Sequence, residues 1–154
     1  MAPVELSADP RFARRVRRLI AVSVVALGVI TLLAWDDGAS GMAVALLAVG
    51  WATMPSVLAV SLRAPRTRYL LVVPATVVTL GLLLVSTSDA GSARLGWWSI
   101  TAGVGLGGVL GMWLWYRLMP VPRCLDDPFA AGRWALITVH VAAIAVGVVL
   151  VALG

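Results

Sequence analysis

Hydrophobic residues occur in five long blocks along the chain, separated by short polar segments. The blocks cover residues 19–35, 41–62, 69–86, 95–118 and 134–153, and none has an Asp, Glu or Arg before its final turn. Each is close to the ~20 residues that an α-helix needs to cross about 30 Å of hydrocarbon. Unpaired backbone groups are costly in lipid, so blocks of this length predict helices rather than strands. The sequence therefore predicts an all-α, polytopic membrane protein with a bundle of five transmembrane helices.

Arginine alternates between the segments that separate these blocks. Eleven of the twelve arginines lie before the first block, between blocks two and three, or from the last turn of block four to the start of block five: Arg11, Arg14, Arg15, Arg17, Arg18, Arg63, Arg66, Arg68, Arg117, Arg123 and Arg133. The other two connections hold a single arginine, Arg94, and three acidic residues, Asp36, Asp37 and Asp89. Positive residues in short loops stay cytoplasmic, so we predict a cytoplasmic N-terminus and a C-terminus outside.

Aromatic residues cluster near the ends of the blocks, as amphipathic rings do at membrane interfaces. The outer set is Trp35, Trp97 and Trp98, and the inner set is Tyr69, Trp113, Trp115, Tyr116 and Trp134. We predict that all of them are interfacial anchors.

The N-terminal segment, residues 1–18, is a basic cytoplasmic region ahead of a transmembrane domain that covers residues 19–154. Asp9 and Pro10 are typical of a helix start. We predict an interfacial helical turn in which one face carries candidate contacts to anionic lipid head groups. These candidates are Arg11, Arg14, Arg15 and Arg18. The alternative is that the arginines only set the orientation.

Composition agrees with a membrane protein and excludes several other classes. The chain has 154 residues, 61% hydrophobic and 12% charged, which is too little polar surface for a water-soluble domain. The net charge is +5, but the basic residues lie between the apolar blocks, where membrane insertion requires them. Nucleic-acid binding is therefore not expected. The abundance of Ala, Val, Leu and Gly, with arginine and no lysine, indicates a bacterial protein and so the cytoplasmic (inner) membrane.

The inner connection 119–129 is the longest polar one. Pro120 and Pro122 are expected to end the fourth helix. Asp126 and Asp127 are either a cation or acid–base site or, as we prefer, a helix cap with a salt link to Arg123 or Arg133. Cys124 is either a modification site or an idle thiol. One cysteine permits no internal disulfide.

Glycine repeats every four residues in the fourth block, at Gly103, Gly107 and Gly111. Small residues at this spacing allow another helix to approach closely. We predict that this ridge packs against another helix of the chain, a second copy or a partner subunit.

The single histidine, His140, lies seven residues past Arg133, or about 10 Å along the helix from the inner boundary. An ionisable group at that depth is expected to face the bundle interior. Matching depths along the other blocks predicts an intramembrane polar layer of His140, Ser56, Thr76 and Thr53 with Trp51 above it. Pro55 and Pro74 would each free a carbonyl nearby. The layer either carries a function or only supplies hydrogen-bond partners to a neutral histidine.

The expected function is that of an accessory or scaffold subunit of a bacterial membrane complex, without catalysis of its own. A small proton-coupled or polar-solute transporter that uses the layer around His140 is the alternative. A membrane enzyme acting on a lipid or quinone is a second one. No cofactor or metal site is expected, since one histidine does not supply the two ligands of haem b. The expected partners are the bilayer, anionic head groups, and other subunits or a second copy.

Overall fold

The computed structural model describes residues 10–63, 69–88, 91–111, 113–114 and 130–154, and this part of the chain is helical with no strand. The all-α prediction is confirmed. The elements are α1 (Pro10–Asp36), α2 (Gly41–Arg63), α3 (Val72–Thr87), the short 3-10 helix η3 (Gly91–Ala93), α4 (Arg94–Val104), the π-helix η4 (Gly105–Gly111) and α6 (Ala130–Leu153).

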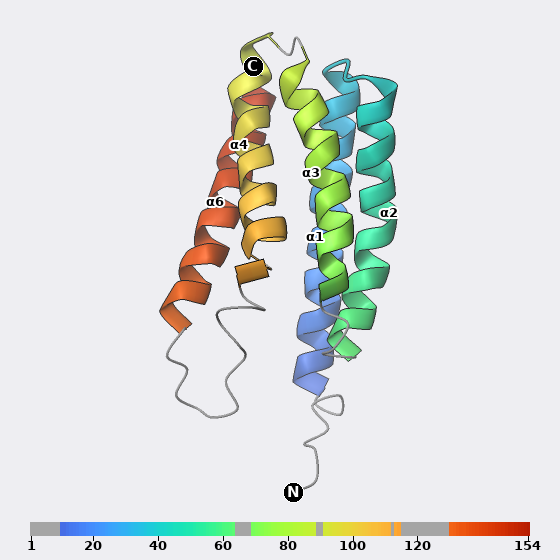
Figure 1. The fold of residues 1–154 in the computed structure, drawn as a ribbon, viewed down its shortest axis with the longest axis vertical. Coiled ribbons are helices and arrows are strands. Elements are labelled where there is room, and N and C mark those ends of the chain that lie inside the picture. The colour runs from blue at the N-terminus through green and yellow to red at the C-terminus, as the bar shows by residue number, and fades with distance from the viewer. Residues whose placement is uncertain (1–9, 64–68, 89–90, 112, 115–129) are drawn as a thin grey trace, which may run out of the picture.

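The long helices run up and down along one bundle axis (Figure 1). In chain order each helix packs against the next, so that α2 contacts α1 and α3, and α4 contacts α3 and α6. α1 begins at the lower end in Figure 1, and α6 finishes at the upper end beside the turn that holds η3. We call these the N-terminal end and the C-terminal end of the bundle.

Three of the described helices are long and apolar enough to cross a membrane: Gly41–Val60, Tyr69–Thr87 and Trp134–Leu153. Ile20–Asp36 is apolar but shorter. The fourth predicted span begins as the 11-residue helix α4 and continues as the 7-residue π-helix η4. The chain therefore contains at least three helices compatible with a membrane location.

Proline occurs in the first turn of two helices and in the interior of a third. α1 begins at Pro10, as predicted, and runs without a break through the arginine-bearing turns to Asp36. Pro55 lies inside α2. Pro74 lies in the first turn of α3, directly after a turn of 3-10 helix over residues 69–71. A proline at this position removes an amide that the α-helix does not use.

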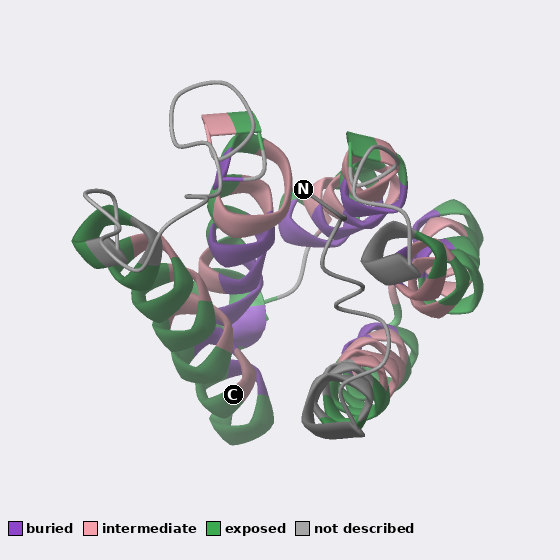
Figure 2. Ribbon diagram, turned by 90° about the horizontal axis from the view of Figure 1, so that it is seen from below, coloured by how far each residue is buried: buried purple, intermediate pink, exposed green. Residues whose placement is uncertain are grey.

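The most deeply buried side chains lie toward the C-terminal end of the bundle. They come from all the helices and include Ile30, Ala34, Ala43, Leu47, Val78, Leu82, Val85, Trp97, Ile100 and Val151. α6 is the least covered of the three long apolar helices, with 11% of its apolar window buried against 39% for α3. In Figure 2 it is the mostly green helix that ends at the C label. α6 thus packs on the bundle along one narrow face.

The aromatic residues do not all share one environment, and one prediction is wrong. Trp97 is fully buried, and its indole N–H donates a hydrogen bond to the Asp37 carboxylate in the α1–α2 turn. It therefore fastens α4 to this turn instead of facing outward. The predicted anchors that are exposed are Trp35, Trp98, Tyr69, Trp113 and Trp134.

Several predictions fall on residues outside the described part of the chain. These are Asp9, Arg66, Arg68, Asp89, Trp115, Tyr116, Arg117, Pro120, Pro122, Arg123, Cys124, Asp126, Asp127 and Pro128.

Candidate functional site

The backbones of α4 and α6 approach each other closely, and glycine makes this approach possible. A Cβ atom on Gly96 would lie 2.7 Å from the Val151 backbone nitrogen and 2.8 Å from the Gly147 carbonyl oxygen. A Cβ on Gly147 would lie 2.7 Å from the Gly96 carbonyl oxygen. Backbone atoms cannot move aside as a flexible side chain can. These two glycines therefore let the helices touch near the C-terminal end of the bundle.

His140 lies on the same seam, against two of the glycines of the predicted ridge. A Cβ on Gly103 would lie 3.1 Å from the His140 carbonyl oxygen and 2.9 Å from Ile144 Cγ1, and a Cβ on Gly107 would overlap the His140 ring. The imidazole thus occupies a notch in the helix surface that exists only because Gly107 has no side chain.

A hydrogen bond fixes the orientation of the imidazole in this notch. His140 Nδ1 lies 2.6 Å from the Gly103 carbonyl oxygen. A carbonyl only accepts, so Nδ1 carries the proton and donates, and in the neutral ring Nε2 is left as the acceptor. The half-buried side chain therefore joins α6 to α4 two residues before η4 begins.

Gly111 does not extend this seam. Among the described residues, the only atoms within 4 Å of its ideal Cβ position belong to Leu106 of its own helix, whose carbonyl oxygen is 2.8 Å away. Gly111 ends the π-helix η4, four residues beyond the point at which Gly107 meets the imidazole.

The other members of the predicted polar layer have separate partners. Trp51 donates its indole N–H to the Val24 carbonyl oxygen on α1, at 2.9 Å. The hydroxyl of Thr53 donates to the Val49 carbonyl and that of Thr76 to the Val72 carbonyl, each one turn earlier in the same helix. Among the described residues, no hydrogen bond joins His140, Ser56, Thr76, Thr53 or Trp51 to another member of this set.

Two hydrogen bonds between helices were not anticipated from the sequence. The Ser99 hydroxyl donates to the Ala143 carbonyl oxygen at 2.8 Å and adds to the α4–α6 seam. The hydroxyls of Ser86 and Thr101, both buried, lie 2.8 Å apart and join α3 to α4. Both residues lie near the short connection between these helices, so their equal depth from the outer boundary is the sequence signal that pairs them.

Removing either hydroxyl of the buried pair is expected to weaken the α3–α4 contact slightly. Each hydroxyl has one proton and also lies within reach of a carbonyl of its own helix, Leu82 for Ser86 and Trp97 for Thr101, so only one of the two donates across the pair at a time. Ser86→Ala or Thr101→Val should each lower the free energy of unfolding by about 0.6 kcal/mol, the average for polar contacts between membrane helices. The double variant should lose little more than either single one.

Denaturation in mixed micelles would measure these differences. Thr87→Val is a matched control, because this exposed hydroxyl bonds only to its own helix. Additive losses in the double variant would show that the two hydroxyls do not act as a pair.

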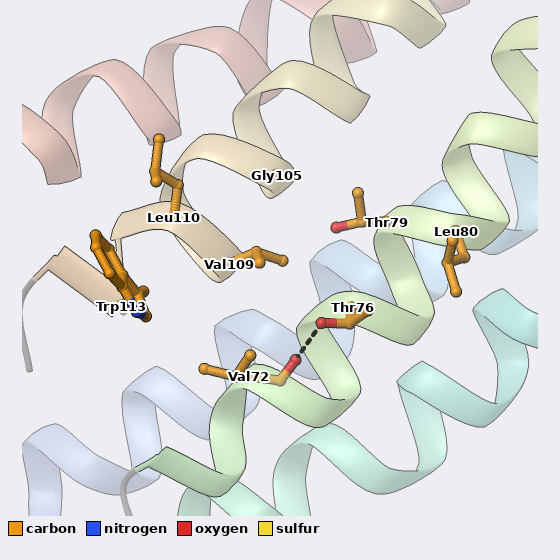
Figure 3. A pocket seen from close by; sticks show the side chains of 8 residues that line it. All are labelled: Val72, Thr76, Thr79, Leu80, Gly105, Val109, Leu110 and Trp113. Atoms are coloured by element: carbon orange, nitrogen blue, oxygen red, sulfur yellow. Dashed lines mark hydrogen bonds between the residues drawn. The ribbon is translucent and has the colours of Figure 1, made fainter.

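A groove opens between α3 and η4, in the half of the bundle nearer the N-terminal end. Its volume is about 400 Å³. Figure 3 shows Val109 of η4 and Thr79 of α3 pointing into it from opposite sides. The lining residues are Val72, Thr76, Thr79, Leu80, Gly105, Val109, Leu110 and Trp113.

The lining offers little to a polar ligand. The hydroxyl of Thr76 donates to the Val72 carbonyl at 2.8 Å and that of Thr79 to the Ala75 carbonyl at 2.7 Å. Both hydroxyl protons are therefore used within α3. The remaining side chains are aliphatic apart from the indole of Trp113. η4 lies between this groove and the seam that holds His140, since Gly105 and Val109 face the groove while Gly107 faces the imidazole.

The N-terminal arginines are exposed where their side chains are described. Arg14, Arg17 and Arg18 project from the first turns of α1. The side chains of the other two candidate head-group contacts, Arg11 and Arg15, lie outside the description. The described residues contain no group of three His, Cys, Asp or Glu side chains that could hold a metal ion.

Comparison with protein-family models, with curated proteins and with solved structures finds no match to this chain. The class of the protein therefore rests on its own features: an all-helical bundle with at least three helices long and apolar enough to cross a membrane.

Proposed function

We propose that this chain is a multi-pass protein of the bacterial inner membrane, with five crossings, a cytoplasmic N-terminus and an outer C-terminus. The up-and-down order of the helices supports this topology. Arg14, Arg17 and Arg18 lie in the first turns of α1, at the N-terminal end of the bundle, where α2 ends at Arg63 and α6 begins at Ala130 (Figure 1). Arg94 lies at the opposite end, so the arginines in the described part of the chain gather mainly on one side, as they do on the cytoplasmic side of a membrane.

Within that membrane the protein acts as an accessory or scaffold subunit of a larger complex. The uncovered surface of α6 is the observation that carries this proposal. The helix packs on α4 through His140, Ala143 and Gly147, and its apolar side chains away from this seam are exposed. The exposed set includes Ile137, Val139, Val141, Val146, Val149 and Leu150. A face of this kind suits packing against the helix of another subunit.

The arrangement of polar groups favours a structural role over transport. A transporter site requires polar side chains that converge, usually at interrupted helices near the midplane. Here Trp51, Ser86, Ser99 and His140 each form a hydrogen bond to a neighbouring helix instead. These bonds hold the bundle together and give a rigid surface for assembly.

Photocrosslinking in native membranes tests the subunit role. A photoreactive amino acid at Val139 or Val146 of α6 is expected to give a discrete adduct with a different membrane protein, which also copurifies stoichiometrically in mild detergent. Val22 and Val25 are matched controls, since they are equally apolar and exposed on α1. They should give only lipid adducts. A protein that purifies alone, with lipid adducts at every position, would contradict the proposal, and self-adducts would replace it with a homo-oligomer.

A further inference from the structure

We propose that the groove between α3 and η4 binds an acyl chain of an anionic phospholipid, as a defined site distinct from the general lipid contact of the bundle. The inference rests on the membrane location proposed above, but not on the subunit role. It joins three observations: the apolar lining of the groove, its position beside the basic end of the bundle, and the indole of Trp113.

The shape of the groove matches an extended hydrocarbon chain. Along α3 it extends from Val72 to Leu80, eight residues or about 12 Å parallel to the bundle axis. The facing wall from Gly105 to Trp113 runs antiparallel to it. The volume of about 400 Å³ lies within the range of small-molecule sites. Because the threonine hydroxyls donate within α3, the walls attract hydrocarbon more than any polar solute.

The groove is open beside Gly105 of the π-helix η4, because glycine presents no side chain to fill it. A Cβ atom on Gly105 would lie 3.6 Å from Thr79 Cγ2, so a side chain at this position would extend into the space between η4 and α3. Such π-helical segments are rare and frequently occur at functional sites.

The positive charges at the N-terminal end of the bundle indicate where the lipid head group lies and that it is anionic. Trp113 is more than half exposed at this end of the groove, where an indole N–H can donate to an ester carbonyl. Arg14, Arg17 and Arg18 are exposed on α1 at this same end. Arginine near the surface favours anionic over zwitterionic head groups. The occupant is therefore a lipid such as phosphatidylglycerol, with its acyl chain directed toward Leu80.

Photoreactive lipids test this site in the full-length protein. The protein is reconstituted in vesicles of phosphatidylglycerol or phosphatidylcholine with identical chains, a small fraction carrying a diazirine near the chain end. We expect adducts concentrated on residues 72–80 and 105–113, with a higher yield for phosphatidylglycerol. Each buried methylene contributes about a fourfold factor to binding, so a side chain that excludes several methylenes should lower the yield by about tenfold or more.

Val109→Trp fills the groove, and Val146→Trp, on the exposed face of α6, is the matched control. Only the first should reduce the adducts. Thr76→Phe is a second filling variant, and competition by unlabelled phosphatidylglycerol on the unchanged protein does not depend on any variant folding. Adducts spread evenly over all exposed apolar positions, or equal yields from the two lipids, would overturn the proposal. So would disulfide formation between copies carrying Thr76→Cys, which would place a second chain in the groove.

Membrane extraction at high pH separates the two proposals. A protein that is released from membranes contradicts the membrane location, and with it both proposals. A protein that stays in the membrane and shows no preferred lipid adducts contradicts the groove site alone.

Discussion

Replacing Gly147 with leucine is expected to separate α6 from α4 and to leave little folded protein. A Cβ at this position would lie 2.7 Å from the Gly96 carbonyl oxygen and 2.8 Å from the Ile100 backbone nitrogen. Even an added methyl group would force the two backbones apart, and leucine adds three more carbons. Overpacking of a tight contact costs about 1–3 kcal/mol and occasionally more, and we expect the upper end, about 3 kcal/mol.

The loss would be measured as the free energy of unfolding in mixed micelles, together with the yield of monodisperse protein. Gly41→Leu is the matched control, because Gly41 is exposed at the start of α2 and nothing lies within 4 Å of its ideal Cβ position. Its cost should be small. If both leucines destabilise the protein equally, the effect arises from glycine replacement in general and not from the α4–α6 seam.

Replacing Gly107 with alanine is expected to be costly in the natural chain and nearly harmless when His140 is also alanine. The new methyl group would overlap the imidazole, which cannot retreat without losing the hydrogen bond to the Gly103 carbonyl. We expect a loss of about 2 kcal/mol, within the range for overpacking. His140→Ala alone should also cost about 2 kcal/mol, through the cavity it leaves and the lost hydrogen bond.

In the double variant the methyl group occupies part of the space that the ring has left. The two losses should therefore not add, with a coupling of about 2 kcal/mol. Gly105→Ala is the matched control in the same π-helix, because its methyl group would meet only Thr79 Cγ2 at 3.6 Å. It should be tolerated with either residue at position 140. Simple additivity of Gly107→Ala and His140→Ala would mean that the imidazole does not fill the notch.

Depth along a helix does not fix rotation about it, as Trp97 and the hydrogen bonds of Thr76 and His140 illustrate. Trp97 is near the end of its block, as an interfacial anchor would be, but α4 is rotated so that the indole faces inward and meets Asp37. Thr76 and His140 were matched by depth, yet their side chains bond to Val72 and Gly103 respectively. The depth of a residue follows from counting residues along its helix. The rotation of the helix about its axis depends on which of its faces pack against the neighbouring helices.

The glycine pattern in the fourth block shows a different limit. A spacing of four residues places glycines near one face of a helix, but it does not fix how far along that face a neighbouring helix stays in contact. Gly103 and Gly107 meet α6, and among the described residues Gly111 does not. Gly96 and Gly147, where the backbones of α4 and α6 touch, lie outside the repeat altogether.

By itself, the sequence determined which segments are helical, approximately where they begin and end, and that at least three of them suit a hydrocarbon environment. These properties depend on the local composition of each segment, because burying the backbone polar groups within a helix needs no partner. The tertiary structure alone decided that α6 is held to α4 by Gly96, Gly147 and the His140 imidazole, and that a groove opens beside η4. These features arise from the relative rotation of packed helices, which is set by side-chain shape at contacts between residues far apart in the chain.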